Sequence, residues 1–323
     1  MTVGANRIAG RATCVESVGV TADDPGPRSV ARGTATAGGD GAGTPSADRA
    51  VRPGLRPVDQ AERAAGCGGV TATASVVADA DGRRPRIRWT QAWPIVLRPT
   101  GDARVHLVHG AGGPLGGDAL ALDVRVGTGA TLAVRSAGAT IVQPGRAPAP
   151  ARWDFGVVVG TGANLDWAPE PTVVTARADY RTSMRIDLAA GARAVVREVV
   201  VLGRNGGAGG RYRGRLDVTV GGHPLLAHTT VLDGEDPALC GPGGIAGGRA
   251  VGTLLVVGEA AGAGSAAASD AVASAGARAP GDLAPGERGD VRWAWTDLAG
   301  PGRALFAVGE PGAVIALLAA AAI

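Results

Sequence analysis

Leu120–Val134, which reads LALDVRVGTGATLAV, decides the fold. Its first half, Leu120–Val126, alternates in side-chain type at period two, as a strand does when one face of its sheet is buried. The glycine-rich segment Gly127–Ala130 follows, and Thr131–Val134 resumes the strand pattern. Because glycine adopts the positive φ that a tight connection needs, this stretch predicts two strands joined by a short turn.

The same turn recurs twice along the chain. Gly160–Leu165 reads GTGANL, and Ala189–Ala194 reads AAGARA, which is a weaker copy. The central glycines, Gly129, Gly162 and Gly191, are 33 and 29 residues apart. A unit of about thirty residues that carries two or three strands predicts stacked, coil-like layers. The alternative is that Gly-Ala turns recur by chance in a chain with 54 glycines.

Further strand patterns complete the fold class. They lie at Phe155–Val159, Met184–Leu188, Val195–Leu202, Leu216–Val220 and Leu225–Leu232. Val251–Val257 is more continuously apolar, so we expect a strand covered on both faces. Ala313–Ala322 reads as a terminal helix. The prediction is a mainly all-β fold of stacked, coil-like β layers, β-helix-like or sandwich-like, with one or two short helices and a helix near the C terminus.

The composition divides the chain into two parts. Residues 1–65 are rich in Gly, Ala, Thr, Asp, Pro and Arg and show no apolar periodicity. Such a segment buries too little apolar surface to offset its ordering entropy, so we expect a disordered, low-complexity extension. Residues 66–323 are predicted to form a single β-rich domain, long enough to bury a substantial core.

Charge and cysteine usage exclude several classes of protein. The net charge is +3, and the arginines are scattered singly rather than clustered, which argues against nucleic-acid binding. Three cysteines without CxxC spacing indicate neither a disulfide framework nor a zinc site. The N terminus has no apolar stretch of signal-peptide length, and Ala313–Ile323 is too short to span a bilayer. We therefore expect a cytoplasmic protein without a membrane partner.

The sequence also lacks the usual catalytic motifs. No GxSxG nucleophile motif is present. Gly110–Gly117 is glycine-rich, but it lacks the Lys-Ser/Thr of a phosphate loop and precedes a strand pattern. His106 and His109 are three residues apart on a predicted strand and so point to opposite faces, while His223 and His228 also differ in parity. We expect no enzyme activity, no tightly bound cofactor and no high-affinity metal site.

One central stretch carries a family resemblance. Val105–Val126, VHLVHGAGGPLGGDALALDVRV, resembles the most distinctive segment of the UreD/UreH urease accessory proteins. In that segment a strand ends in a histidine, followed by a Gly-Gly turn, a Gly-Gly-Asp and an alternating strand. Similar pieces follow in the family's order: Gly129–Thr140, Asn164–Pro171 (NLDWAPEP), Val195–Arg204 (VVREVVVLGR) and Val251–Leu255. The resemblance runs from about residue 69 to 258.

The resemblance implies a β-rich, coil-like fold and a function without catalysis. Proteins of this family bind the urease apoprotein and UreF, and UreF recruits the GTPase UreG, which delivers nickel. They are thought to offer nickel in transit an internal polar passage. The implied nickel-path candidates are Asp118, Asp166, Glu198 and His228, the last where the family often has an acidic residue. The implied structural motif consists of His109, Gly112, Gly113, Gly116 and Gly117.

Two of these candidates, Glu198 and Asp118, carry an alternative. Glu198 lies in a largely apolar run, where an unpaired carboxylate is costly, and a salt bridge with Arg193 or Arg197 would also explain it. Asp118 could instead cap the glycine turn through a local hydrogen bond. For the whole chain, the alternatives are a β-solenoid enzyme acting on polysaccharide and a generic β-sandwich binding module.

Overall fold

The computed structural model describes residues 68–81, 84–146, 148–204, 207–245, 247–258 and 286–322. Chain contacts divide the protein into Met1–Pro53 and Gly54–Ile323, and every described residue belongs to the second unit. The predicted extension at residues 1–65 lies outside the described residues, so that prediction and the single domain at 66–323 stay predictions.

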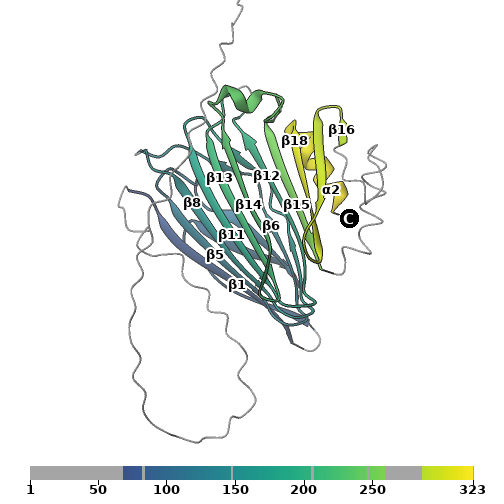
Figure 1. The fold of residues 1–323 in the computed structure, drawn as a ribbon. Helices are drawn as coiled ribbons and strands as arrows, with labels where there is room; N and C mark the ends of the chain where they lie inside the picture. Colours follow the sequence, from purple (N-terminus) through teal and green to yellow (C-terminus); the bar gives the residue numbers. More distant parts are fainter. Residues whose placement is uncertain are drawn as a thin grey trace, which may run out of the picture. The chain divides into compact units, whose positions relative to one another are not determined.

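Two β-sheets make up most of the described part (Figure 1). The seven-stranded sheet has the order β14-β13-β11-β8-β5-β1-β2. Its strands are β1 (Thr71–Asp81), β2 (Arg84–Thr90), β5 (Ala119–Val126), β8 (Ala151–Val159), β11 (Asp179–Leu188), β13 (Arg211–Val220) and β14 (His223–Asp233).

The eleven-stranded sheet has the order β16-β17-β18-β15-β12-β9-β6-β4-β3, and β10 joins it through β12 and β7. Its strands are β3 (Ile95–Gly101), β4 (Arg104–His109), β6 (Thr131–Ser136), β7 (Thr140–Val142), β9 (Asn164–Trp167), β10 (Thr172–Val174), β12 (Arg193–Leu202), β15 (Ala250–Val257), β16 (Gly286–Arg288), β17 (Val291–Asp297) and β18 (Gly302–Gly309).

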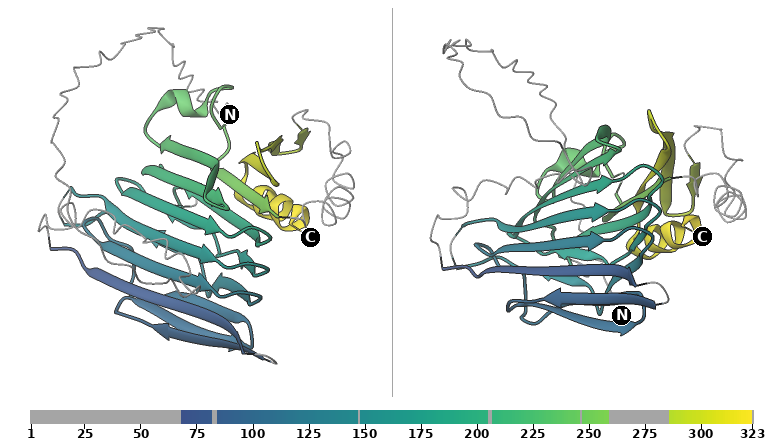
Figure 2. Two further views of the ribbon diagram at one scale, coloured as in Figure 1. Left: turned by 60° about the horizontal axis from the view of Figure 1, so that its bottom comes forward. Right: turned by 90° about the horizontal axis from the view of Figure 1, so that it is seen from below.

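The centre of both sheets is a parallel coil. β1, β5, β8, β11 and β13 are parallel neighbours in one sheet, and β4, β6, β9 and β12 are parallel neighbours in the other. The chain runs from one sheet to the other and back, so each turn of the coil adds a strand to both (Figure 2). The predicted stacked, coil-like layers are therefore confirmed.

The repeated glycine turns are the corners of this coil. They join β5 to β6, β8 to β9 and β11 to β12, and Gly129, Gly162 and Gly191 have φ values of 67°, 64° and 74°. Successive corners stack through backbone hydrogen bonds, because the N–H of Asn164 donates to Ala130 at 2.8 Å and that of Arg193 to Ala163 at 2.9 Å. The thirty-residue spacing is thus the length of one coil.

Antiparallel strands flank the coil. β2 and β14 pair with the outermost parallel strands of one sheet, and β3 and β15 do so in the other, with β18, β17 and β16 beyond β15. β15 is buried on both faces as predicted. Leu255 faces the core between the sheets, while Leu254 packs under helix α2 (Pro311–Ala321) with Val314 and Leu318.

The C-terminal helix is also confirmed, and a short 3-10 turn, η2, spans Pro237–Cys240. Within the described part of the chain, no helix is long and apolar enough to cross a membrane.

Side chains at every second position fill the space between the sheets. Across the seven-stranded sheet, one inward ladder runs Leu122, Phe155, Met184, Leu216 and His228. Most inward positions are Ala, Val and Leu, which suits a chain with only 3% aromatic residues. His228, at the end of this ladder, is polar, and the apolar core is interrupted there.

Candidate functional site

Polar residues from both sheets meet at one place between them. On the eleven-stranded sheet, Glu198 of β12, Thr253 of β15 and Phe306 of β18 are in register. On the facing sheet, a second register ladder carries Thr182 of β11 and Thr230 of β14. These positions are inward because they share the strand parity of buried neighbours such as Val196 and Leu216.

Two small cavities border these residues. The first, here called the aromatic cavity, has a volume of about 50 Å³. The second, here called the histidine cavity, has a volume of about 20 Å³. A single water needs about 10–15 Å³ by this kind of measure, so the two cavities have room for a few waters in all. Both cavities are lined by Glu198, Val200 and Tyr212, which makes these residues the boundary between them.

Glu198 is the only carboxylate shared by the two cavities. Burial raises the pKa of its side chain from 4.5 to about 7, because the charged form loses its hydration. The proposed salt bridge is not what the geometry provides, since Arg193 and Arg197 have the opposite strand parity. Among the described residues, Glu198 has no ion pair or hydrogen bond to a protein side chain. It is therefore a carboxylate poised between its charged and neutral forms near pH 7.

Two tyrosines stand beside this carboxylate. Tyr180 and Tyr212 are paired in register on β11 and β13, with ring centroids 6.0 Å apart. Burial raises the pKa of both phenols, and the charge of Glu198 raises them further. The Tyr212 hydroxyl lies 3.0 Å from the Thr182 hydroxyl. Both phenols therefore stay protonated and can donate or accept hydrogen bonds next to Glu198.

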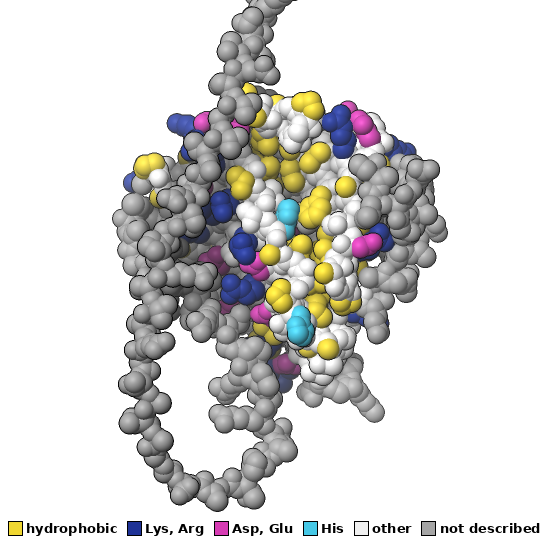
Figure 3. Space-filling model, in the orientation of Figure 1, with side chains coloured by type: hydrophobic (Ala, Val, Ile, Leu, Met, Phe, Trp, Pro, Cys, Tyr) yellow, Lys and Arg dark blue, Asp and Glu magenta, His cyan; other side chains and the backbone are white. Residues whose placement is uncertain are grey.

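His228 borders the histidine cavity together with Glu198. Its Nε2 lies 3.0 Å from the Thr230 hydroxyl, and its ring packs on Phe306 with centroids 4.6 Å apart. Partial burial lowers the pKa of the imidazole, so the ring is uncharged at neutral pH. Figure 3 shows hydrophobic and uncharged side chains over much of the face formed by β14 and β15, with histidine side chains among them. A neutral imidazole is a competent metal ligand.

The scarce aromatic residues are concentrated here. The chain has two tyrosines and two phenylalanines. Tyr180, Tyr212 and Phe155 line the aromatic cavity, and Phe306 contacts His228. Trp153 and Trp167 also line the aromatic cavity; Trp153 stacks on Phe155, and Trp167 meets Phe155 edge to face. Their indole N–H groups are buried without a hydrogen-bond partner in the described protein.

The other two path candidates lie away from these cavities. Asp118, only 5% exposed, accepts backbone N–H bonds from Val70 and Leu115, each at 2.8 Å. Its carboxylate thus ties the start of β5 to the preceding loop, as the capping alternative describes. Asp166 is on the outer face of β9 and forms an ion pair with Arg135. The structure therefore brings together Glu198 and His228, but places Asp118 and Asp166 elsewhere.

The glycine motif forms the loop before β5. His109 contacts the Ala111 carbonyl through Nδ1 at 2.8 Å and packs its ring against Trp153. Gly116 allows a close backbone approach, because a Cβ there would lie 2.6 Å from the Gly145 nitrogen. Gly117 has a φ of 97°, which favours glycine. Gly112 and Gly113 continue the same loop, in which Gly113 precedes Pro114.

Sequence reasoning missed the tyrosines and threonines of the site. Tyr180 and Tyr212 are 32 residues apart, which is one coil, and both have inward parity. That spacing, together with the rarity of tyrosine in this chain, is the signal that could have found them. Thr182, Thr230 and Thr253 carry no such signal, because threonine is an ordinary strand residue.

The arrangement suits transient rather than tight metal binding. In the part of the chain that the structure describes, no three His, Cys, Asp or Glu residues are grouped to hold a metal ion. Glu198 presents a carboxylate and His228 an imidazole at the edge of the same cavity, and both groups are able to ligate a metal ion. Hydroxyl groups and water would complete the shell of a divalent cation. A cation held this way exchanges easily.

Comparison with known proteins supports the resemblance seen in the sequence. The family model described as UreD urease accessory protein matches residues 63–311. The urease accessory protein UreD of Frankia alni is 44% identical over 187 residues, which cover 53% of this chain and 63% of that protein. The UreD of Streptomyces coelicolor is 40% identical over 205 residues, covering 59% of this chain and 78% of that protein. The match thus spans less than two thirds of the Frankia alni protein. Because the family model covers most of the chain, this chain belongs to the UreD family of urease accessory proteins.

Proposed function

We propose that this protein is a non-catalytic scaffold for urease maturation that guides nickel between its two sheets. In this proposal it binds the urease apoprotein and UreF, and UreG is brought to the complex by UreF. The family supports a role in urease maturation, since its members are named urease accessory proteins. Nickel is cargo in this account and the protein holds no resident cofactor.

The observation that carries the nickel route is the position of Glu198. An unpaired carboxylate in a core of Val, Leu and aromatic residues destabilises the fold, so its retention calls for a function. Glu198 lies at the boundary of two adjoining cavities, with His228 on one side and Tyr180 on the other. A polar chain of this kind replaces part of the hydration shell of a cation as it moves.

The proton equilibrium of Glu198 fits this transfer. With a pKa of about 7, the side chain is partly neutral when no cation is present, which limits the cost of burying it. An approaching divalent cation favours the carboxylate form and displaces the proton. Release of the cation allows the proton to return. Nickel passage is therefore coupled to proton exchange at this residue.

The scaffold role is tested by complex formation and by loss of urease activity. The protein should co-purify with UreF and the urease apoprotein when the three are expressed together. A strain that lacks this chain should accumulate urease without nickel and recover activity on complementation. Fully active urease in that strain at low nickel would overturn the proposal.

A further inference from the structure

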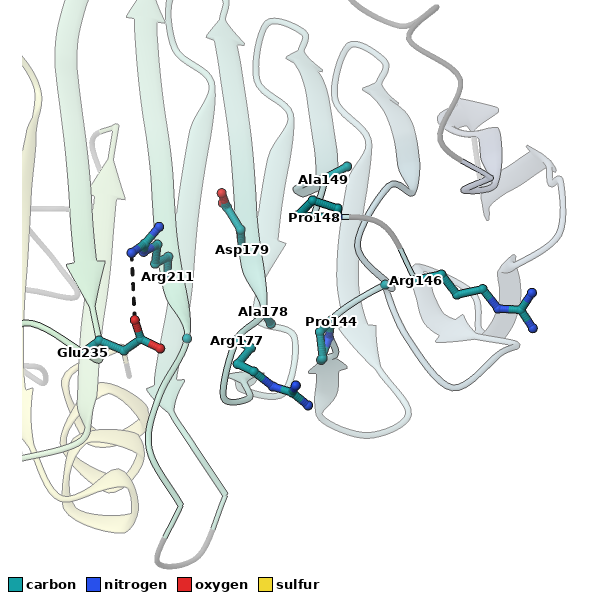
Figure 4. Close-up of a pocket in the computed structure, with 11 residues that line it drawn as sticks. Pro144, Arg146, Pro148, Ala149, Arg177, Ala178, Asp179, Arg211 and Glu235 are labelled. Carbon is teal, nitrogen blue, oxygen red and sulfur yellow. Dashed lines mark ion pairs between the residues drawn. The ribbon is translucent and has the colours of Figure 1, made fainter.

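A third, larger cavity lies at the rim of the seven-stranded sheet, where the parallel strands begin. Its volume is about 510 Å³. The loops before β8, β11 and β13, the first residues of β11 and β13, and Glu235 shortly after β14 form it (Figure 4). Its lining includes Arg146, Arg177 and Arg211 and the carboxylates Asp179 and Glu235. This rim is opposite to the glycine corners, which follow the ends of the same strands.

Arg177 has an unusual backbone at this rim. Its φ is 61°, and among the described residues it is the only non-glycine residue with a positive φ. It occupies the third position of a turn closed by Ala178 N–H donating to the Thr175 carbonyl at 3.1 Å, where glycine is the usual choice. The chain uses glycine for its coil corners but not here. An arginine retained in a costly conformation points to a role for its side chain.

The turn that carries Arg177 is held firmly. The Thr175 hydroxyl donates to the Val142 carbonyl at 2.7 Å. Gly210 lies so close beneath the turn that a Cβ there would be 2.3 Å from the Ala178 oxygen and 2.4 Å from the Thr175 oxygen. The backbone of Arg177 is therefore held in place by its neighbours, although its side chain is exposed.

The charges around the cavity do not cancel. Arg211 pairs with Asp233 at 3.0 Å and Glu235 at 3.9 Å, and Asp179 pairs with Arg181 at 3.3 Å. Arg146 and Arg177 have no ion pair or hydrogen bond within the described residues. Figure 4 shows their guanidinium groups apart from each other, on different sides of Pro144. Two separated cations suit carboxylates spaced along a peptide better than they suit one small oxyanion.

Two exposed apolar side chains, here called the apolar step, lie beside the cavity. Leu115 and Val70 are 43% and 42% exposed, and Asp118 binds the backbone N–H groups of both. Gly116, which follows Leu115 in the sequence, makes a close backbone contact with Gly145 in the cavity wall. Exposed apolar side chains beside arginines are the composition typical of protein interfaces.

From the Arg177 backbone, the two unpaired guanidinium groups and the adjoining apolar step, we infer that this rim binds an acidic segment of a partner protein, with carboxylates at Arg146 and Arg177 and an apolar side chain on Leu115 and Val70. This inference does not depend on the nickel route, because the rim cavity shares no lining residue with the two inner cavities.

The test uses a fluorescein-labelled peptide of repeated Glu-Glu-Leu units, followed by fluorescence anisotropy at low ionic strength. The full chain should bind it, and Arg146→Glu with Arg177→Glu should weaken binding about tenfold or more, since charge-assisted contacts are lost and repulsion is added. Arg125→Glu, at an exposed position of β5, is the matched control and should bind as the unchanged protein does. A Gln-Gln-Leu peptide should not bind.

Arg177→Gly keeps the test decisive if the glutamate variants fold poorly. Glycine suits the positive φ, so this variant should unfold at an equal or higher temperature and still bind the peptide less tightly. Equal binding by the Arg177 variants and the Arg125 control would overturn the inference. So would displacement of the peptide by inorganic phosphate at matched ionic strength, because the site would then be one for a small oxyanion.

Discussion

At the scale of the residue, Glu198 is the position where stability and function oppose each other. Its side chain is in a core that otherwise consists of Val, Leu and aromatic groups, and it has no cation partner in the described protein. Because the charged form loses its hydration there, this environment favours neutral Glu198 over charged Glu198. The residue was predictable from the sequence because a carboxylate interrupts an apolar run. Its cavity was not, because the facing tyrosines come from other coils.

The first prediction concerns the pH dependence of stability at Glu198. Its folded pKa of about 7 is above the ordinary 4.5, so the folded state binds the proton more tightly and loses stability as pH rises from about 4.5 through 7. At about 1.4 kcal/mol per pKa unit, the loss is at most roughly 3.5 kcal/mol. Glu198→Gln should therefore gain free energy of unfolding over the unchanged protein at pH 8.5 and much less at pH 5, measured by urea denaturation.

Asp123→Asn is the control for that comparison, because Asp123 is an exposed carboxylate of β5. Its difference from the unchanged protein should be small at both pH values. If Glu198→Gln behaved like this control, the interpretation of Glu198 as a buried carboxylate with a raised pKa would be wrong.

The second prediction separates Asp118 from the nickel route. Its two oxygens hold the N–H groups of Val70 and Leu115, so Asp118→Ala leaves two backbone donors without partners. The expected cost is roughly 2–4 kcal/mol of unfolding free energy, measured by urea denaturation. In contrast to Glu198→Gln, this variant should be less stable at both pH 5 and pH 8.5. Unchanged stability would contradict the anchoring role.

At the scale of the element, the glycine corners were the most predictable part of the fold. Their spacing in the sequence equals one coil, and alternation identified strands such as β5. Among the flanking antiparallel strands, β14 and β15 were predicted from the sequence, whereas β2, β3, β16, β17 and β18 were not identified. β16, β17 and β18 follow residues 259–285 and lie outside the repeat, and the pairing of β18 with β15 is set by tertiary packing rather than by a local signal. A repeat of about thirty residues can be recognised in the sequence, whereas the pairing of strands that are distant in the sequence cannot.

The third prediction concerns the glycine corners of the coil. Gly162 has a φ of 64° between β8 and β9, and an added Cβ would meet open space, so any cost is conformational. Gly162→Ala should lower the free energy of unfolding by about 1 kcal/mol. Gly138→Ala, in an open position without a positive φ, is the matched control and should have little effect. Equal thermal shifts for the two variants would argue against the left-handed corner.

At the scale of the whole molecule, two sheets built by one coil place a small group of polar side chains between them, within a largely apolar core. Each coil supplies one strand to each sheet, so residues far apart in sequence, such as Glu198 and His228, reach the same cavity. The family resemblance led to both residues, and it also led to Asp118 and Asp166, which have structural partners instead. Motif order identifies the family, but only the register decides which carboxylates face inward.

Nickel-dependent activation of urease tests the central claim most directly. A strain without this chain is complemented with the unchanged protein, Glu198→Gln or Asp123→Asn, and the initial rate of urease activation is measured at limiting nickel. Both variants replace a carboxylate by an amide of similar size, and both should still co-purify with UreF and the urease apoprotein. The account predicts that Glu198→Gln lowers the activation rate about tenfold, as loss of a charged ligand would, while Asp123→Asn leaves it unchanged. Full activation by Glu198→Gln in an intact complex would contradict the route between the sheets.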